Sequence, residues 1–222
     1  MGPGMILVPF KNLRKAKQRL AGVLDAGQRA ALAAAMLEDV LNTLAAWPAR
    51  LPVAVVTGDP WAIETARGFG FDVIRDEVDG GETNAIEMAT RFCEASGTAW
   101  TLVLPADIPL MEAEELSAIL AAAPAEGSVL VPAGDGRGTN AALRRPAALF
   151  PLRFGDDSFL PHRSVAQATG KPCVVLRLAG IGLDIDRPAD LAAVLERPDR
   201  TRTQDLLRGW SLSERFAVAQ SR

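Results

Sequence analysis

The chain has 222 residues, of which 49% are hydrophobic, enough for one globular domain with a substantial core. Its 24 basic and 27 acidic residues give a net charge of −3 without a basic stripe, which argues against a nucleic-acid-binding function. No apolar stretch is long enough to span a bilayer, the N-terminus lacks a charged signal region, and two distant cysteines form no zinc motif, so we expect a cytoplasmic protein.

Short apolar runs alternate with longer amphipathic stretches along the chain. Strands are expected at 5–9, 52–57, 71–74, 100–104, 129–132 and 173–178, with another after the turn-rich loop 133–145. Helices are expected at 27–47, 61–69, 83–95, 112–123, 158–169 and 187–195. This alternation predicts an α/β fold with a mainly parallel sheet covered on both faces. One domain is expected at 5–197, followed by an extension at 198–222 that packs on the core or on a second subunit.

An acid follows the strand expected at 100–104. In the segment TLVLPADIPLM, Asp107 interrupts an apolar run between two prolines. A carboxylate at the edge of a core is costly unless another group balances its charge. Because ligands of parallel sheets bind beyond the carboxyl ends of the strands, Asp107 is expected at the ligand edge.

Five cations lie within nine residues after the first strand, in the segment KNLRKAKQR: Lys11, Arg14, Lys15, Lys17 and Arg19. Each one alone is typical of a solvated face, but five together at the ligand edge favour a site for a polyphosphate. The segment has neither a P-loop nor a glycine-rich dinucleotide fingerprint.

Two further acids occur in GLDIDRPADL. Asp184 and Asp186 are two residues apart, so on an extended strand both side chains point to one face. Asp186 or Asp190 would also suit the start of the helix that Pro188 favours, whereas capping does not explain Asp184. Together with Asp107 these acids supply the oxygen ligands that Mg²⁺ prefers, with positions left for phosphate and water.

Small polar residues follow in GRGTNAALRR and FGDDSFLPH. Thr139, Asn140 and Ser158 are candidate donors to a small carboxylate, beside glycines that let backbone amides approach a ligand. Ser158 is equally suited to be an ordinary helix N-cap. His162, the only histidine, either lines this pocket or packs elsewhere.

The segments VPFKNLRKAKQRLAGVL, VVTGDP, TNAI, VLPADIPLM, GRGTNAALRRP, FGDDSFLPH and LDIDRPADL occur in the order seen in the guanylyltransferases of deazaflavin coenzyme F-420 biosynthesis. The chain resembles this family from about residue 5 to residue 195, although Arg137 stands where a second glycine is usual. The resemblance implies a single-domain, three-layer nucleotidyltransferase-like fold of the nucleotide-diphospho-sugar transferase type. It also implies transfer of GMP from GTP to the phosphate of a phosphorylated three-carbon acid, with release of pyrophosphate.

The resemblance assigns roles to the candidate residues. The groups expected to hold Mg²⁺ between the GTP phosphates and the acceptor are Asp107, Asp184 and Asp186. The cations expected to hold the triphosphate are Lys11, Lys17 and Arg19, and Lys17 and Asp107 are expected to be catalytic. Asn84, in TNAI, is expected to contact the nucleotide. The acceptor's carboxylate is assigned to Thr139 and Ser158.

The acceptor in this family is 2-phospho-L-lactate, phosphoenolpyruvate or 3-phospho-D-glycerate. Met88 and Cys93 follow Asn84 on the same predicted helix, and flexible side chains there would leave room for phosphoglycerate. On this basis 3-phospho-D-glycerate ranks before phosphoenolpyruvate. The downstream transferase that loads the product onto the deazaflavin precursor is a candidate partner. The alternatives are a sugar-phosphate or molybdopterin nucleotidyltransferase and a nucleotide-binding regulatory domain without turnover.

Overall fold

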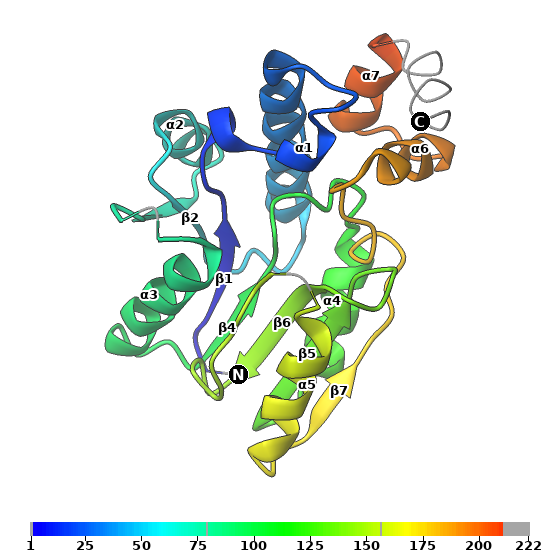
Figure 1. Ribbon diagram of the computed structural model, residues 1–222. Coiled ribbons are helices and arrows are strands. Elements are labelled where there is room, and N and C mark those ends of the chain that lie inside the picture. The colour runs from blue at the N-terminus through cyan, green and yellow to red at the C-terminus, as the bar shows by residue number, and fades with distance from the viewer. Residues whose placement is uncertain (1, 79, 156, 211–222) are drawn as a thin grey trace.

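The computed structural model describes residues 2–78, 80–155 and 157–210, the side chain of Lys15 excepted. Within these residues seven strands form one sheet in the order β3-β2-β1-β4-β6-β5-β7 (Figure 1). Their bounds are β1 Gly4–Pro9, β2 Val53–Thr57, β3 Asp72–Arg75, β4 Trp100–Val103, β5 Gly127–Pro132, β6 Thr139–Arg145 and β7 Cys173–Val175. Only β6 runs antiparallel to its neighbours, β4 and β5, so the predicted mainly parallel sheet is confirmed.

Helices cover both faces of the sheet (Figure 1). The α-helices are α1 Ala26–Ala46, α2 Pro60–Gly68, α3 Glu82–Ala95, α4 Ala113–Ala122, α5 Phe159–Ala168, α6 Pro188–Glu196 and α7 Arg202–Gly209. Two short 3₁₀ helices, η1 Leu13–Lys15 and η2 Gln18–Leu20, follow β1. α3 and α5 contribute to the core on one face, and α1, α2, α4, α6 and α7 to the core on the other.

The period of two along each strand explains these three layers. In β1, Ile6 and Val8 join the α1 side of the core, whereas Leu7 between them joins the α3 side. All three side chains are fully buried. A strand that is apolar on both faces must be covered on both, in agreement with the predicted sheet covered on both faces.

The chain leaves the sheet earlier than expected after β7. This strand ends at Val175, and residues 176–187 run back across the carboxyl ends of the strands as a segment without regular structure. Gly180 lies on this path, where an added Cβ would come within 2.1 Å of the Leu110 carbonyl oxygen. The close approach of two backbones therefore requires glycine at this position.

The C-terminal extension begins with α7, which packs on α1. The buried Asp39 carboxylate of α1 accepts hydrogen bonds from the backbone amides of Arg202 and Thr203, both at 2.9 Å. An acid at a helix N-terminus satisfies free amides and favours the helix dipole. Residues 211–222 of the extension lie outside the described residues. In the described part of the chain no helix is long and apolar enough to cross a bilayer.

Candidate active site

A cavity of about 860 Å³ opens at the carboxyl ends of the parallel strands. Its walls come from the segments that follow β1, β4, β5 and β7 and from the starts of α3, α5 and α6. The predicted site residues among its lining are Lys11, Lys17, Arg19, Asp107, Thr139, Asn140, Ser158, Asp184 and Asp186. Asn84 is not in this lining, and its side-chain amide donates to the Gly80 carbonyl at 2.7 Å.

Lys17 lies at the centre of the charged wall. Its ammonium donates to Asp107 Oδ2 at 2.6 Å and to Asp186 Oδ1 at 2.9 Å, and Arg19 donates to the second oxygen of Asp186 at 3.0 Å. Lys17 takes the left-handed backbone conformation, with φ of 50°, between the two 3₁₀ helices after β1. A non-glycine residue in this region is uncommon and marks a locally strained turn.

These ion pairs fix the charges of their members. Burial would favour neutral Lys17, but Asp107 and Asp186 raise its pKa well above the ordinary value. Burial likewise opposes the charge on Asp186, yet Lys17 and Arg19 hold the pKa of that carboxyl below its usual range. The site therefore contains a fixed ammonium and a fixed carboxylate at neutral pH.

Asp184 lies outside this ion-pair network. It accepts a hydrogen bond from Asn140 Nδ2 at 2.9 Å, and the same nitrogen donates to the Ile181 carbonyl. Burial, and then the charge of Asp107, raise the pKa of Asp184 to about 6. Asn140 is thus committed to holding Asp184 and is not a donor to the acceptor acid. Two carboxylates, those of Asp107 and Asp184, face one cavity with incomplete charge balance.

Backbone hydrogen bonds bring the acids together from distant segments. The Ile185 amide donates to the Asp107 carbonyl at 3.1 Å, which ties the segment after β4 to the one that carries the other two acids. The buried Glu115 of α4 supports the same segment by accepting from the amides of Gly180 and Ile181, at 2.7 and 3.0 Å. Asp190 accepts from the backbone amides that precede α6, so Asp186 is left to pair with Lys17.

The predicted magnesium site stays a prediction. Among the described residues no group of three or more His, Cys, Asp or Glu side chains is arranged to hold a metal ion. Lys17 instead bridges two of the three expected ligands. The donor chemistry still fits, because the carboxylates of Asp107 and Asp184 line the same cavity, where burial, and then the charge of Asp107, raise the pKa of Asp184. A divalent cation relieves such repulsion and prefers these oxygen ligands.

Two residues with hydroxyl groups, Thr139 and Ser158, also line the cavity, and a buried histidine contacts Thr139. Ser158 occupies the N-cap position of α5 but makes no capping bond, and its Oγ accepts from the Thr139 amide at 3.1 Å. His162, only 1% exposed, lies behind them with Nδ1 2.9 Å from Thr139 Oγ1 and Nε2 2.7 Å from the Arg153 amide. Burial, and then the charge of Arg144, lower the pKa of His162 to about 4, so the ring is neutral.

Glu82 is a member of the site that sequence analysis missed. It is the first residue of α3 and lines the cavity. Burial, and then the charge of Asp107, raise the pKa of Glu82 to about 7. Its position in GGETNA gave a signal, because an acid just after two glycines at a helix start lies at the ligand edge of such a sheet. Glutamate is also common in first helical turns, which conceals that signal.

Other predicted features are placed differently. Arg137, the departure from the family pattern, lines the cavity and forms an exposed salt bridge with Asp157. Met88 and Cys93 do not line the cavity. Both pack in the core on the α3 face, and Cys93 is 1% exposed. Their predicted effect on the acceptor pocket therefore has no support from the geometry.

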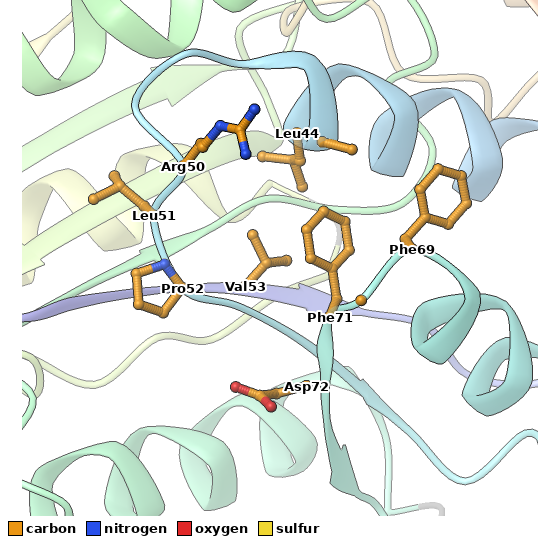
Figure 2. Close-up of a pocket in the computed structure, with 10 residues that line it drawn as sticks. Leu44, Arg50, Leu51, Pro52, Val53, Phe69, Phe71 and Asp72 are labelled. Carbon is orange, nitrogen blue, oxygen red and sulfur yellow. The ribbon is translucent and has the colours of Figure 1, made fainter.

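A second, smaller cavity of about 350 Å³ lies at the other end of the strands (Figure 2). It is bounded by residues 50–53 before and at the start of β2, by residues 69–72 before and at the start of β3, and by the end of α1. Its charged residues are Arg50 and Asp72, and its other lining residues are apolar or glycine. It lies at the amino ends of parallel strands, where such sheets do not bind their ligands. The larger cavity is therefore the candidate active site.

Known proteins resemble this chain over most of its length. A phosphoenolpyruvate guanylyltransferase of Rubrobacter xylanophilus is 38% identical over 84% of this chain and 90% of its own length. A 3-phospho-D-glycerate guanylyltransferase of Colwellia psychrerythraea is 34% identical over 87% and 92% of the two chains. A 2-phospho-L-lactate guanylyltransferase of Methanothermobacter thermautotrophicus is 32% identical over 97% and 93%.

The fold is also that of solved nucleotidyltransferase-like structures. A Desulfovibrio desulfuricans protein described as a nucleotide-diphospho-sugar transferase superposes with a TM-score of 0.79 at 21% identity, over 97% of this chain and 99% of that one. The family model for CofC-like guanylyl transferases matches residues 4–222. The chain therefore belongs to the CofC-like guanylyl transferase family.

Proposed function

We propose that this protein transfers GMP from GTP to the phosphate of a small phosphorylated three-carbon acid and releases pyrophosphate, in coenzyme F-420 biosynthesis. The observation that carries the proposal is the fixed Lys17 ammonium between Asp107 and Asp186, in a cavity at the ligand edge of a guanylyltransferase-family fold. The product would pass to the transferase that loads the deazaflavin precursor.

The reaction joins two anions, so its main barrier is charge repulsion and alignment. An oxygen of the acceptor phosphate attacks the α-phosphorus of GTP, the bond from that phosphorus to the bridging oxygen breaks, and pyrophosphate leaves with the electron pair. The attacking oxygen is already anionic at neutral pH, so no general base is required. Lys17, with Lys11 and Arg19 on the same wall, supplies positive charge where the phosphates must gather.

Mg²⁺ would be held by Asp107, Asp184 and Asp186, and when bound it supplies charge that neutralises phosphate oxygens. Lys17 forms ion pairs with two of these carboxylates, those of Asp107 and Asp186. Thr139 would donate to the acceptor's carboxylate, and Ser158, also in the cavity lining, would support it, because the Ser158 hydroxyl donates to Thr139 Oγ1 at 3.5 Å. Asn84 remains a proposed nucleotide contact at the start of α3, near Glu82 in the cavity wall.

Phosphoenolpyruvate is the acceptor that we place first. The ranking of acceptors from the sequence, with 3-phospho-D-glycerate first, depended on Met88 and Cys93. Neither side chain lines the cavity. Relatives named for phosphoenolpyruvate reach 38% identity, compared with 34% for one named for 3-phospho-D-glycerate and 32% for one named for 2-phospho-L-lactate.

The test is pyrophosphate release from GTP or ATP with each of the three acids, with and without Mg²⁺. We expect release with GTP and phosphoenolpyruvate, dependent on Mg²⁺. Turnover only with a sugar phosphate or a molybdopterin would show a different nucleotidyltransferase. GTP binding without turnover on any acceptor would show a nucleotide-binding regulatory domain.

A further inference from the structure

His162 joins three segments behind the acceptor end of the cavity. It lies on α5, its Nδ1 contacts Thr139 at the start of β6, and its Nε2 contacts the backbone amide of Arg153 in the segment that leads to α5. Phe154, which follows Arg153 and lines the cavity, meets the imidazole edge-on with ring centroids 5.3 Å apart.

The hydrogen-bond partners determine which ring nitrogen carries the proton. A backbone N–H can only donate. The Nε2 atom, which accepts a hydrogen bond from the Arg153 N–H at 2.7 Å, must therefore be unprotonated. In a neutral ring the proton is then on Nδ1, which donates to Thr139 Oγ1 at 2.9 Å. With this tautomer both hydrogen bonds have one donor and one acceptor, and each nitrogen of the buried ring has a partner.

The same bonds determine the direction of the Thr139 hydroxyl proton. The Thr139 oxygen accepts from His162 and, at the limit distance of 3.5 Å, from the Ser158 hydroxyl. The oxygen of Ser158 is itself engaged by the Thr139 amide. With its neighbours acting as donors, the Thr139 hydroxyl is left to donate its own proton toward the cavity that it lines.

We propose that His162 is a positioning residue for the acceptor: its Nδ1–H makes the Thr139 hydroxyl a donor toward the acceptor's carboxylate. The inference rests on the proposed function, because it assumes an acid at this end of the cavity. His162 does not touch the substrate. Its contribution is selective for the acceptor, since the phosphate-binding cations belong to the segment after β1 and share none of its hydrogen bonds.

Two substitutions separate the two bonds of the ring. His162→Asn places an amide nitrogen near the Nδ1 position and keeps a donor to Thr139, whereas His162→Gln places an amide oxygen near the Nε2 position and keeps the acceptor for the Arg153 amide. We expect His162→Gln to raise KM for phosphoenolpyruvate about tenfold, the size of one lost hydrogen bond, without changing KM for GTP. His162→Asn stays within about twofold of wild type for both substrates.

Thr139→Val shows whether the effect passes through the hydroxyl. We expect it to raise KM for the acceptor at least as much as His162→Gln, and the double variant to be no worse than Thr139→Val alone. Equal effects of the two His162 variants, multiplicative effects in the double variant, or a matching rise in KM for GTP would overturn the inference. Wild-type protein that turns over none of the three acids would overturn the proposed function, and the inference with it.

Nitrogen NMR of the wild-type imidazole gives a test that needs no substitution. His162 is the only histidine of the chain, so in untagged protein labelled with ¹⁵N-histidine both ring nitrogens are assigned without ambiguity. We expect a neutral ring protonated on Nδ1, whose nitrogen shifts change when phosphoenolpyruvate is added. A ring protonated on Nε2, or a charged ring at neutral pH, would refute the proposed bond to Thr139.

Discussion

Lowering the pH should decrease the free energy of unfolding, because His162 is held neutral in the folded protein. The ordinary pKa of histidine is 6.5, and burial together with Arg144 lowers that of His162 to about 4. Between these two values the unfolded chain binds a proton that the folded protein does not. Lowering the pH therefore favours unfolding, and the loss begins near the unfolded pKa and is complete near the folded one.

The expected size follows from the shift in pKa. Each unit corresponds to about 1.4 kcal/mol, so the full loss is about 3 kcal/mol, of which about 2 kcal/mol falls between about pH 7.5 and about pH 5. Glu82 and Asp184, whose pKa values are raised in the fold, contribute in the opposite direction over part of this range. A comparison with a protein that lacks only the histidine removes their contribution.

The assay is urea denaturation of wild type and His162→Asn at several pH values. The difference in the free energy of unfolding, wild type minus variant, should fall by about 2 kcal/mol from about pH 7.5 to about pH 5. A difference that does not change with pH would show that the ring is not held neutral by burial. A difference that grows in favour of wild type as the pH falls would show that the folded state binds the proton, contrary to the observed contacts.

Three other substitutions test how the site is supported. Asp39→Ala should lower the free energy of unfolding by about 2–3 kcal/mol, because two amides of α7 lose their buried acceptor. The control Asp205→Ala, at an exposed residue, should change it by less than about 0.5 kcal/mol, and equal losses in a urea titration would contradict the proposed role of Asp39 in holding α7. Glu115→Ala should lower the free energy of unfolding by about 2–4 kcal/mol and reduce turnover, since Glu115 holds the segment that carries Asp184 and Asp186. The exposed Glu114→Ala is the matched control, and unchanged turnover in folded Glu115→Ala protein would show that this segment does not depend on Glu115. Gly180→Ala should lower the melting temperature markedly, because its Cβ would collide with a backbone carbonyl, and a melting curve like that of wild type would show that the two segments separate easily.

Much of the fold was predictable because its strands are apolar on both faces. Runs such as 5–9 and 100–104 are too short for helices and too apolar for surface strands, and the structure places them as neighbours in the centre of the sheet. The expected loop at 133–145 was wrong in its second half, because residues 139–145 form β6. The antiparallel direction of β6 was not predicted either, since the turn residues of this segment do not show which strand the chain pairs with next. Likewise, the early end of β7 depends on the contact of Gly180 with α4 and the segment before it.

Site residues that directly follow a strand could be predicted from the sequence. Roles that depend on a contact with a residue far away in the chain could not. Asp107 and Lys17 were found because each comes just after a central strand. Their mutual contact spans 90 residues of sequence, and the contact of Lys17 with Asp186 spans 169, so no local pattern reveals them. The same reason explains why Asn140 was taken for an acceptor contact when it holds Asp184.

The central claim is that GMP transfer takes place in the cavity lined by Asp107. The most direct measurement compares pyrophosphate release from GTP and phosphoenolpyruvate by Asp107→Asn and by Asp72→Asn, an exposed aspartate of the second cavity. We predict a loss of about a hundredfold or more in the first variant, with the protein still folded, and wild-type rates in the second. Full activity of Asp107→Asn, or a loss confined to Asp72→Asn, would contradict the assignment of the active site.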